Sequence, residues 1–206
     1  MQRGGGVMVE VCHFVFQLQN TASNFAGQFL MNRLAKGSRP VVTLTEAIMT
    51  GAAKIKTLHY KRSHFVTQLP VDYLYSPSHF WVASQAGDLW RVGLTKFATR
   101  MLGDMVDCGF EPKAGSPVAG GQIIGWVEGF KAISDVYCAL EGNFSGANPV
   151  LKEKITLINK DPYDAGWLYE VSGQPDAKCV DVQTYKAMLD KTIDRILEKQ
   201  KGDQAG

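Results

Sequence analysis

Between residues 65 and 171 the sequence alternates short apolar runs with turn signals, and this pattern constrains the fold more than any other feature. His79–Ala83 and Leu89–Leu94, for example, are too short for typical helices, and the residues between them include Gly87 and Asp88. Many short strands at such spacing indicate an antiparallel sandwich or barrel. We therefore expect a mainly β fold.

Two helices interrupt this pattern. Thr95 is a plausible N-cap for a short helix over Lys96–Leu102, which Gly103 would end. Near the C-terminus, apolar residues recur at steps of three and four after Asp181, a plausible cap. They form one face of an amphipathic helix, and we expect this face to pack on the sheet. Its residues are Val182, Tyr185, Leu189, Ile193, Ile196 and Leu197.

Three segments follow from these assignments: an N-terminal extension over residues 1–64, a β domain over 65–175, and a C-terminal helix and tail over 176–206. The extension shows no clear periodicity and is expected to be poorly ordered or weakly helical, with one short helix over Leu44–Ala53. Within the β domain, Met105–Phe110 reads as a strand and 141–143 as a turn. The four tryptophans are expected to fill its core: Trp81, Trp90, Trp126 and Trp167.

Lys131 is the candidate functional residue. It lies between two predicted strands, Gln122–Glu128 and Ile133–Leu140, so the sequence predicts a primary amine at the tip of a β-hairpin. Gly129 permits a tight turn, and Phe130 and Ile133 are expected to pin the tip against the domain. Such an amine is suited to covalent attachment of a group that supplies chemistry the side chains lack.

Composition excludes several other functions. The net charge of +2 gives no reason to expect a nucleic-acid partner, and no apolar run approaches the length of a membrane span. The four cysteines are scattered and the four histidines lack metal-ligand spacing, so we expect neither a metal site nor a disulfide framework. Cys108 and Cys138 are interpreted as buried packing residues. No catalytic motif appears, and we expect a monomeric protein that is not an enzyme.

The expected location is the cytoplasm, because the cysteine pattern suits a reducing compartment. An alternative is the mitochondrial matrix, if residues 1–50 act as a transit peptide. Residues 1–69 carry eight Lys or Arg and two acidic residues, whereas residues 70–206 carry 14 Lys or Arg and 18 acidic residues. An acid-poor, arginine-containing N-terminus is typical of such peptides.

Four sequence motifs, in matching order and spacing, resemble the glycine cleavage system H protein family of the lipoyl-domain superfamily. They are RVGLTKFA (91–98), LGDMV (102–106), VEGFKAISD (127–135) and LINKDPYDAGWL (157–168). The resemblance covers residues 71–172 and extends more loosely into the C-terminal helix. It implies a lipoyl/biotinyl-type β sandwich, also called a barrel-sandwich hybrid.

The resemblance also implies a function. The lysine of the third motif carries lipoate in this family, which makes Lys131 the expected attachment site. A lipoyl-lysine of this kind carries the aminomethyl group of glycine between enzymes. The implied partners are glycine decarboxylase, aminomethyltransferase, dihydrolipoamide dehydrogenase and a lipoyl ligase or transferase. Glu128 and Asp135 flank the lysine and are candidates for recognition by that ligase.

Three alternatives remain open at this stage. Biotin is a competing cofactor, although biotinyl domains flank their lysine with methionines, whereas Phe130 and Ala132 stand here. H proteins carry His-Glu-Trp where this chain has His79-Phe80-Trp81, and Phe80 cannot offer a carboxylate to a cationic aminomethyl group. A lipoate carrier for another pathway, such as sulfur oxidation or lipoyl relay, is therefore a second interpretation. An unmodified interaction domain is the third.

Overall fold

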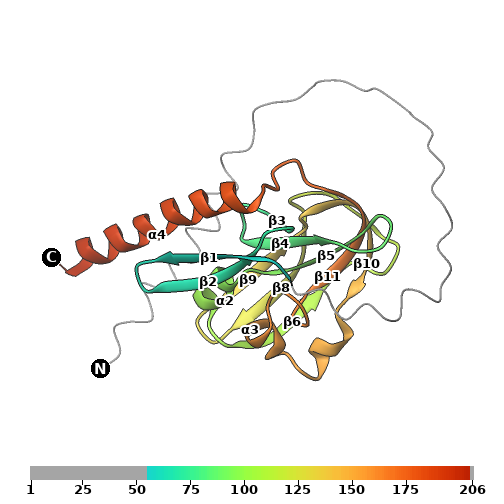
Figure 1. Cartoon of the computed structure of the whole chain (residues 1–206). Helices are drawn as coiled ribbons and strands as arrows, with labels where there is room; N and C mark the ends of the chain where they lie inside the picture. Colours follow the sequence, from blue (N-terminus) through green and yellow to red (C-terminus); the bar gives the residue numbers. More distant parts are fainter. Residues whose placement is uncertain (1–54, 205–206) are drawn as a thin grey trace, which may run out of the picture.

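A computed structural model describes residues 55–204 (Figure 1). The N-terminal half of this region contains β1 Thr57–Arg62, β2 Phe65–Pro70, β3 Leu74–Tyr75, β4 Phe80–Ser84, β5 Leu89–Leu94, α2 Lys96–Leu102 and β6 Met105–Phe110. The C-terminal half contains β7 Pro117–Val118, β8 Ile123–Gly129, β9 Ile133–Tyr137, β10 Leu140–Ala147, a 3-10 helix Pro149–Lys152, α3 Leu157–Lys160, β11 Tyr169–Pro175 and α4 Val182–Gln204.

The described strands form three antiparallel sheets. A six-stranded sheet has the order β3-β4-β5-β11-β10-β7, and a three-stranded sheet has the order β6-β8-β9. The strands β1 and β2 pair only with each other and form a separate hairpin. The two larger sheets contribute side chains to one core, so the mainly β sandwich predicted from the sequence is confirmed.

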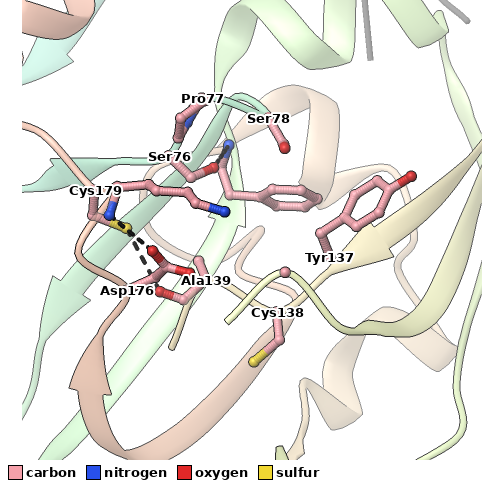
Figure 2. A pocket seen from close by; sticks show the side chains of 11 residues that line it. Ser76, Pro77, Ser78, Tyr137, Cys138, Ala139, Asp176 and Cys179 are labelled. Atoms are coloured by element: carbon pink, nitrogen blue, oxygen red, sulfur yellow. Dashed lines mark hydrogen bonds between the residues drawn. The ribbon is translucent and has the colours of Figure 1, made fainter. Parts of the chain in front are cut away.

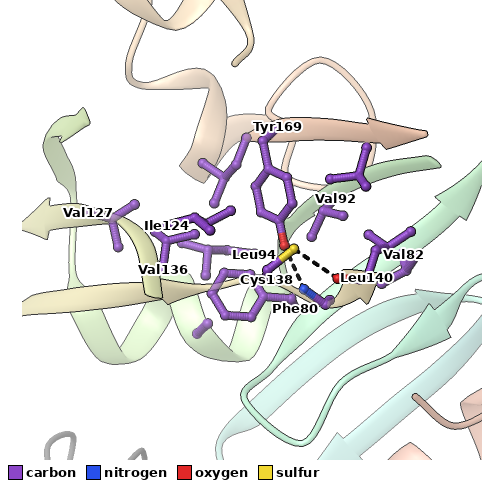
Figure 3. Close-up of a cluster of buried hydrophobic side chains, with 14 of the residues drawn as sticks. Phe80, Val82, Val92, Leu94, Ile124, Val127, Val136, Cys138, Leu140 and Tyr169 are labelled. Atoms are coloured by element: carbon purple, nitrogen blue, oxygen red, sulfur yellow. Dashed lines mark hydrogen bonds between the residues drawn. The ribbon is translucent and has the colours of Figure 1, made fainter. Parts of the chain in front are cut away.

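This core is built from the alternating inward side chains of both sheets. The six-stranded sheet contributes residues from β4, β5, β10 and β11, and the three-stranded sheet contributes residues from β8 and β9. Figure 3 shows part of this core and labels Phe80, Val82, Val92, Leu94, Ile124, Val127, Val136, Cys138, Leu140 and Tyr169. Cys138 is buried among them and its thiol donates to the carbonyl of Leu140 at 3.1 Å, which confirms its packing role.

The strand β4 is buried on both faces, which explains its uninterrupted apolar sequence. Phe80 and Val82 enter the main core, whereas Trp81 and Ala83 enter a second cluster on the opposite face of the strand. Side chains of α4, α2 and the β1–β2 hairpin complete that second cluster. Figure 1 shows α4 running alongside this hairpin.

Polar contacts join α4 to the hairpin. The hydroxyl of Tyr60 in β1 donates to Asp190 of α4 at 3.0 Å, and the guanidinium of Arg62 binds Asp194 through two nitrogens. Along residues 55–204, no helix combines the length and apolar content needed to cross a bilayer. The amphipathic α4 instead covers one side of the domain, as its periodicity predicted.

Both helix predictions are confirmed. Helix α2 spans Lys96–Leu102, the Thr95 hydroxyl accepts the N–H of Ala98, and Gly103 ends the helix with a φ of 87°. At α4, Asp181 accepts the N–H of Thr184 at 2.8 Å. These backbone hydrogen bonds hold the pKa of the Asp181 carboxyl below its usual range.

Two predictions in the β domain are wrong. Residues 141–143 do not form a turn but lie within β10, and β9 ends at Tyr137, before the predicted limit at Leu140. Gly142 faces Gly173 across the pair, where a Cβ on either glycine would collide with the backbone of the other strand. Glycine therefore allows a close strand approach here and does not mark a turn.

The tryptophan prediction is only partly correct. Trp81 is fully buried, Trp90 and Trp167 are half-buried, and Trp126 is exposed on the outer side of β8. The helix expected over 44–53 lies outside the described residues.

Candidate functional site

Lys131 occupies the turn between β8 and β9. The N–H of Gly129 donates to the carbonyl of Ala132 at 2.9 Å, and the N–H of Ala132 donates back to Gly129 at 3.2 Å. Phe130 and Lys131 are therefore the two central residues of a two-residue hairpin loop. The exposed amine lies where the strand pattern predicted it.

Tertiary hydrogen bonds hold this turn in shape. Two-residue hairpin loops favour turn types with positive φ at one or both central residues, but neither Phe130 nor Lys131 has a positive φ. Their N–H groups donate instead to carbonyls outside the hairpin. Phe130 donates to Asp104 at 2.8 Å and Lys131 donates to Leu102 at 2.9 Å. The connection from α2 to β6 therefore clamps the turn from below.

Two glycines make this clamp sterically possible. A Cβ on Gly129 would collide with the carbonyl oxygen of Leu102 and lie 3.0 Å from its Cβ. A Cβ on Gly103 would lie 3.0 Å from Cγ of Lys131 and 3.4 Å from its Cδ. The aliphatic stem of the lysine therefore runs across the bare backbone of Gly103.

Asn159 supports the clamp from the opposite side. Its side-chain amide donates to the carbonyl of Gly103 at 3.0 Å, and its side-chain oxygen accepts the N–H of Met105 at 2.8 Å. Its backbone carbonyl accepts the amine of Lys96 at 2.6 Å. Sequence reasoning missed this role, because Asn159 lies in the fourth motif, far along the chain from the turn. Its presence within a motif was the only available signal.

Comparison with known proteins places this geometry in a family. The family model of the glycine cleavage H-protein matches residues 73–194, more than half of the chain. The chain belongs to the glycine cleavage H-protein family. The hairpin β1–β2 precedes the matched region and is therefore an addition to the part shared with the family.

Sequence and structure comparisons with individual H proteins support this family membership. The chain is 40% identical over 125 residues to the glycine cleavage system H protein of Corynebacterium jeikeium, covering 59% of this chain and 98% of the relative. It is 36% identical over 133 residues to that of Mycobacterium leprae, covering 61% and 100%. The crystal structure of an H protein from Mycobacterium marinum aligns with a TM-score of 0.53 at 31% identity, covering 58% of this chain and 97% of that chain.

The surface around the lysine differs from the one that the sequence predicted. Phe130 and Ile133 were expected to pin the tip, but they are 86% and 63% exposed, so that prediction is wrong. The three-stranded sheet has an uncovered outer face, and Ile133 lies on it opposite Glu128. Trp126 and Asp135 form the next pair on the same face. The lysine is therefore bordered by exposed apolar side chains and two carboxylates.

Phe80, which replaces the family glutamate, is a core residue here. It is 1% exposed, packs in the main core, and its N–H donates to the Ser76 hydroxyl at 3.1 Å. It also lines a small cavity of about 40 Å³ (Figure 2), together with Ser76, Ser78, Tyr137 and Cys179. This cavity holds no more than a few waters and is too small for a prosthetic group.

The three cysteines of residues 55–204 are poorly reactive. Cys138 is buried, whereas Cys179 and Cys108, which was interpreted as buried, are only half-buried. Burial raises the pKa of the Cys108 thiol to about 11 and that of Cys179 to about 12. Burial also raises the pKa of the Cys138 thiol. Thiols of this kind form little thiolate at neutral pH. Over residues 55–204, no group of three or more His, Cys, Asp or Glu side chains is arranged to hold a metal ion.

His79 is likewise structural. It is fully buried, and its Nδ1 lies 2.8 Å from the hydroxyl of Tyr185 on α4. Burial lowers the pKa of the imidazole to about 3, so the ring is neutral at physiological pH. Ring contacts with Phe97 and Tyr185 make His79 a packing residue.

The residues around Lys131 fit a lipoyl group in amide linkage. The amine is exposed, the turn that carries it is fixed by backbone hydrogen bonds, and Gly103 leaves a path for the lysine stem. Acylation removes the lysine charge and leaves a neutral amide on a surface with apolar neighbours such as Phe130.

Proposed function

We propose that this protein is the lipoyl-carrier protein of the glycine cleavage system, with lipoate attached to the Nζ of Lys131. The observation that carries this proposal is an exposed lysine in a clamped hairpin turn of an H-protein family member. The chain itself is a carrier subunit and performs no catalysis.

The chain's own residues present the amine. The N–H groups of Phe130 and Lys131 donate to the carbonyls of Asp104 and Leu102 and fix the turn, so an enzyme that acts on the amine meets one backbone geometry. The carboxylates of Glu128 and Asp135, beside the exposed ring of Phe130, offer a mixed acidic and apolar surface to a lipoyl ligase or transferase.

When bound, the lipoyl group supplies a disulfide that accepts the aminomethyl group of glycine and a flexible arm that reaches several active sites. The covalent tether keeps the reactive group at high local concentration for each docked enzyme. The partners are glycine decarboxylase, aminomethyltransferase and dihydrolipoamide dehydrogenase. Because Lys131 lies in the hairpin turn, the rest of the domain surface is available for docking to these enzymes.

Glycine–bicarbonate exchange tests this function. The lipoylated full chain, mixed with purified glycine decarboxylase, is expected to support exchange of labelled bicarbonate into the glycine carboxyl group. Lys131→Arg keeps a cation in the turn but cannot be lipoylated, and it is expected to give background exchange only. Background exchange by the fully lipoylated protein would overturn the assignment to glycine cleavage.

A further inference from the structure

The short helix α2 is packed on two sides. Ala98 and Leu102 enter the main core of the sandwich, whereas Phe97 and Met101 enter the second cluster, to which the β1–β2 hairpin contributes its buried side chains. A helix of seven residues is too short to be stable by itself in water. The position of α2 therefore depends on packing, and the hairpin supplies part of one of its two packed sides.

Two contacts join the hairpin turn to α2. The buried ring of Phe65 meets the ring of Phe97 edge-on, with 5.6 Å between the ring centres. The guanidinium of Arg100 donates to the carbonyl of His64 at 3.2 Å and lies 5.7 Å from the ring centre of Phe65. Phe97 lies in the first turn of α2 and Arg100 in its last turn. The hairpin therefore contacts both ends of the helix.

Helix α4 fixes the hairpin through its other strand. The β1 residues Tyr60 and Arg62 donate to Asp190 and Asp194 of α4, each at 3.0 Å. Among residues 55–204 the strands β1 and β2 pair only with each other, so no sheet holds the hairpin in place. Side-chain contacts with α4 on β1 and with α2 on β2 therefore set its position.

The end of α2 that contacts the hairpin also holds the lysine turn. The carbonyls of Leu102 and Asp104, which follow Arg100 closely in the chain, accept the N–H groups of Lys131 and Phe130. A movement of the last turn of α2 would weaken both hydrogen bonds. A loosened turn would present the amine in several geometries, and an enzyme would bind only the fraction of molecules in the correct one.

We propose that the β1–β2 hairpin positions Lys131 for the enzyme that acylates it, with Phe65 and Arg100 as positioning residues that act through α2. The hairpin precedes the residues that match the family, so this support is an addition in this chain. The proposal rests on lipoylation of Lys131, as the proposed function does.

Amide hydrogen exchange of the full, isotope-labelled chain tests the positioning without any enzyme. The readout is the exchange rate of the N–H groups of Phe130 and Lys131, which the clamp protects. Phe65→Ala is expected to speed both rates about five- to tenfold, because the turn opens more easily when α2 loses this contact. Val66→Ala, an exposed position on the opposite face of the same strand, is expected to leave them unchanged.

Steady-state lipoylation by a purified lipoyl ligase tests the consequence for the reaction. Phe65→Ala is expected to raise the KM for the carrier protein about threefold and to leave kcat unchanged, because the turn is already formed once the enzyme has bound it. The Phe65 side chain is buried, so a raised KM does not reflect a lost contact with the ligase. Val171→Ala, which opens a cavity in β11 of the main core, is expected to keep the parent KM.

Arg100 provides a second pair of variants that leave the core intact, because its side chain is exposed. Arg100→Ala is expected to change the exchange rates and KM in the same direction as Phe65→Ala, and these readouts decide if Phe65→Ala does not fold. Arg100→Lys keeps a donor for the His64 carbonyl and is expected to restore most of the parent behaviour.

Parent exchange rates and a parent KM in the folded variants would overturn the positioning role while the carrier function stands. A raised KM in Val171→Ala as well would assign the effect to lost stability and would also overturn it. A parent chain that the ligase does not modify would overturn both the proposed function and this proposal.

Discussion

The N–H of Lys131 donates to the carbonyl of Leu102 at 2.9 Å, which ties the turn bearing the amine to the C-terminal end of α2. A hairpin tip is ordinarily free to move, because it projects beyond the ladder of its strands. Here the last carbonyls of a helix, which lack partners within the helix, find donors in the turn. One hydrogen bond therefore satisfies a helix end and orients the carrier lysine.

Gly129→Ala is expected to break this relationship. The new methyl group would collide with the Leu102 carbonyl, so either the turn or the end of α2 must shift. We expect the free energy of unfolding, measured with urea, to fall by about 1–3 kcal/mol. Gly202→Ala makes the same change in open space on α4 and is expected to leave stability unchanged or slightly higher. Equal stability of Gly129→Ala and the parent would contradict the clamp.

Phe80→Glu tests whether the family glutamate can be restored. Phe80 is buried between the sheets, so a carboxylate there would lose its hydration without gaining a partner. The expected cost in the free energy of unfolding is about 3–5 kcal/mol. Phe80→Leu, which keeps an apolar side chain, is expected to cost about 1 kcal/mol. If both variants are equally stable, the position opens to solvent and our description of the core is wrong.

His79 makes stability depend on pH. The unfolded imidazole binds a proton below a pKa near 6.5, whereas burial keeps the native ring neutral down to a pKa of about 3. In this window the unfolded state binds more protons, so stability falls as the pH is lowered from 6.5. The expected contribution reaches about 1.4 kcal/mol per pH unit within the window.

Urea unfolding at several pH values between 6.5 and 4.5 measures this slope. His79→Gln removes the titrating group and is expected to flatten the slope, whatever its effect on stability at neutral pH. The same slope in both proteins would show that the ring is protonated in the native state.

The elements with strong local signals were predicted well. The cap at Thr95 and the stop at Gly103 bound α2 correctly, because both act through hydrogen bonds and backbone freedom within a few residues. The position of Lys131 followed from two strands of alternating character on either side of it. These features depend little on the rest of the chain.

The wrong predictions concern contacts between distant segments. The apolar residues Phe130 and Ile133 do not reveal from sequence which face of the hairpin packs against another part of the domain. In the structure both side chains are exposed. Gly142 looked like a turn residue, but its meaning depends on Gly173 in the facing strand. The clamp from Leu102 and the support from Asn159 are likewise invisible without the fold.

The hairpin β1–β2 was not predicted either. Its strands bury Tyr60, Phe65 and Leu69 against α4 and α2, and most of their exposed residues are polar. The alternation is clear once the partner surface is known, but the stretch is short and follows a segment without periodicity.

Intact mass of the full chain, co-expressed with a lipoyl ligase and supplied with lipoate, tests the central claim most directly. The account predicts one species heavier by a single lipoyl group, with the modified peptide containing Lys131, and an unmodified Lys131→Arg variant. A parent protein at its unmodified mass, or a Lys131→Arg variant that still gains the group, would contradict it.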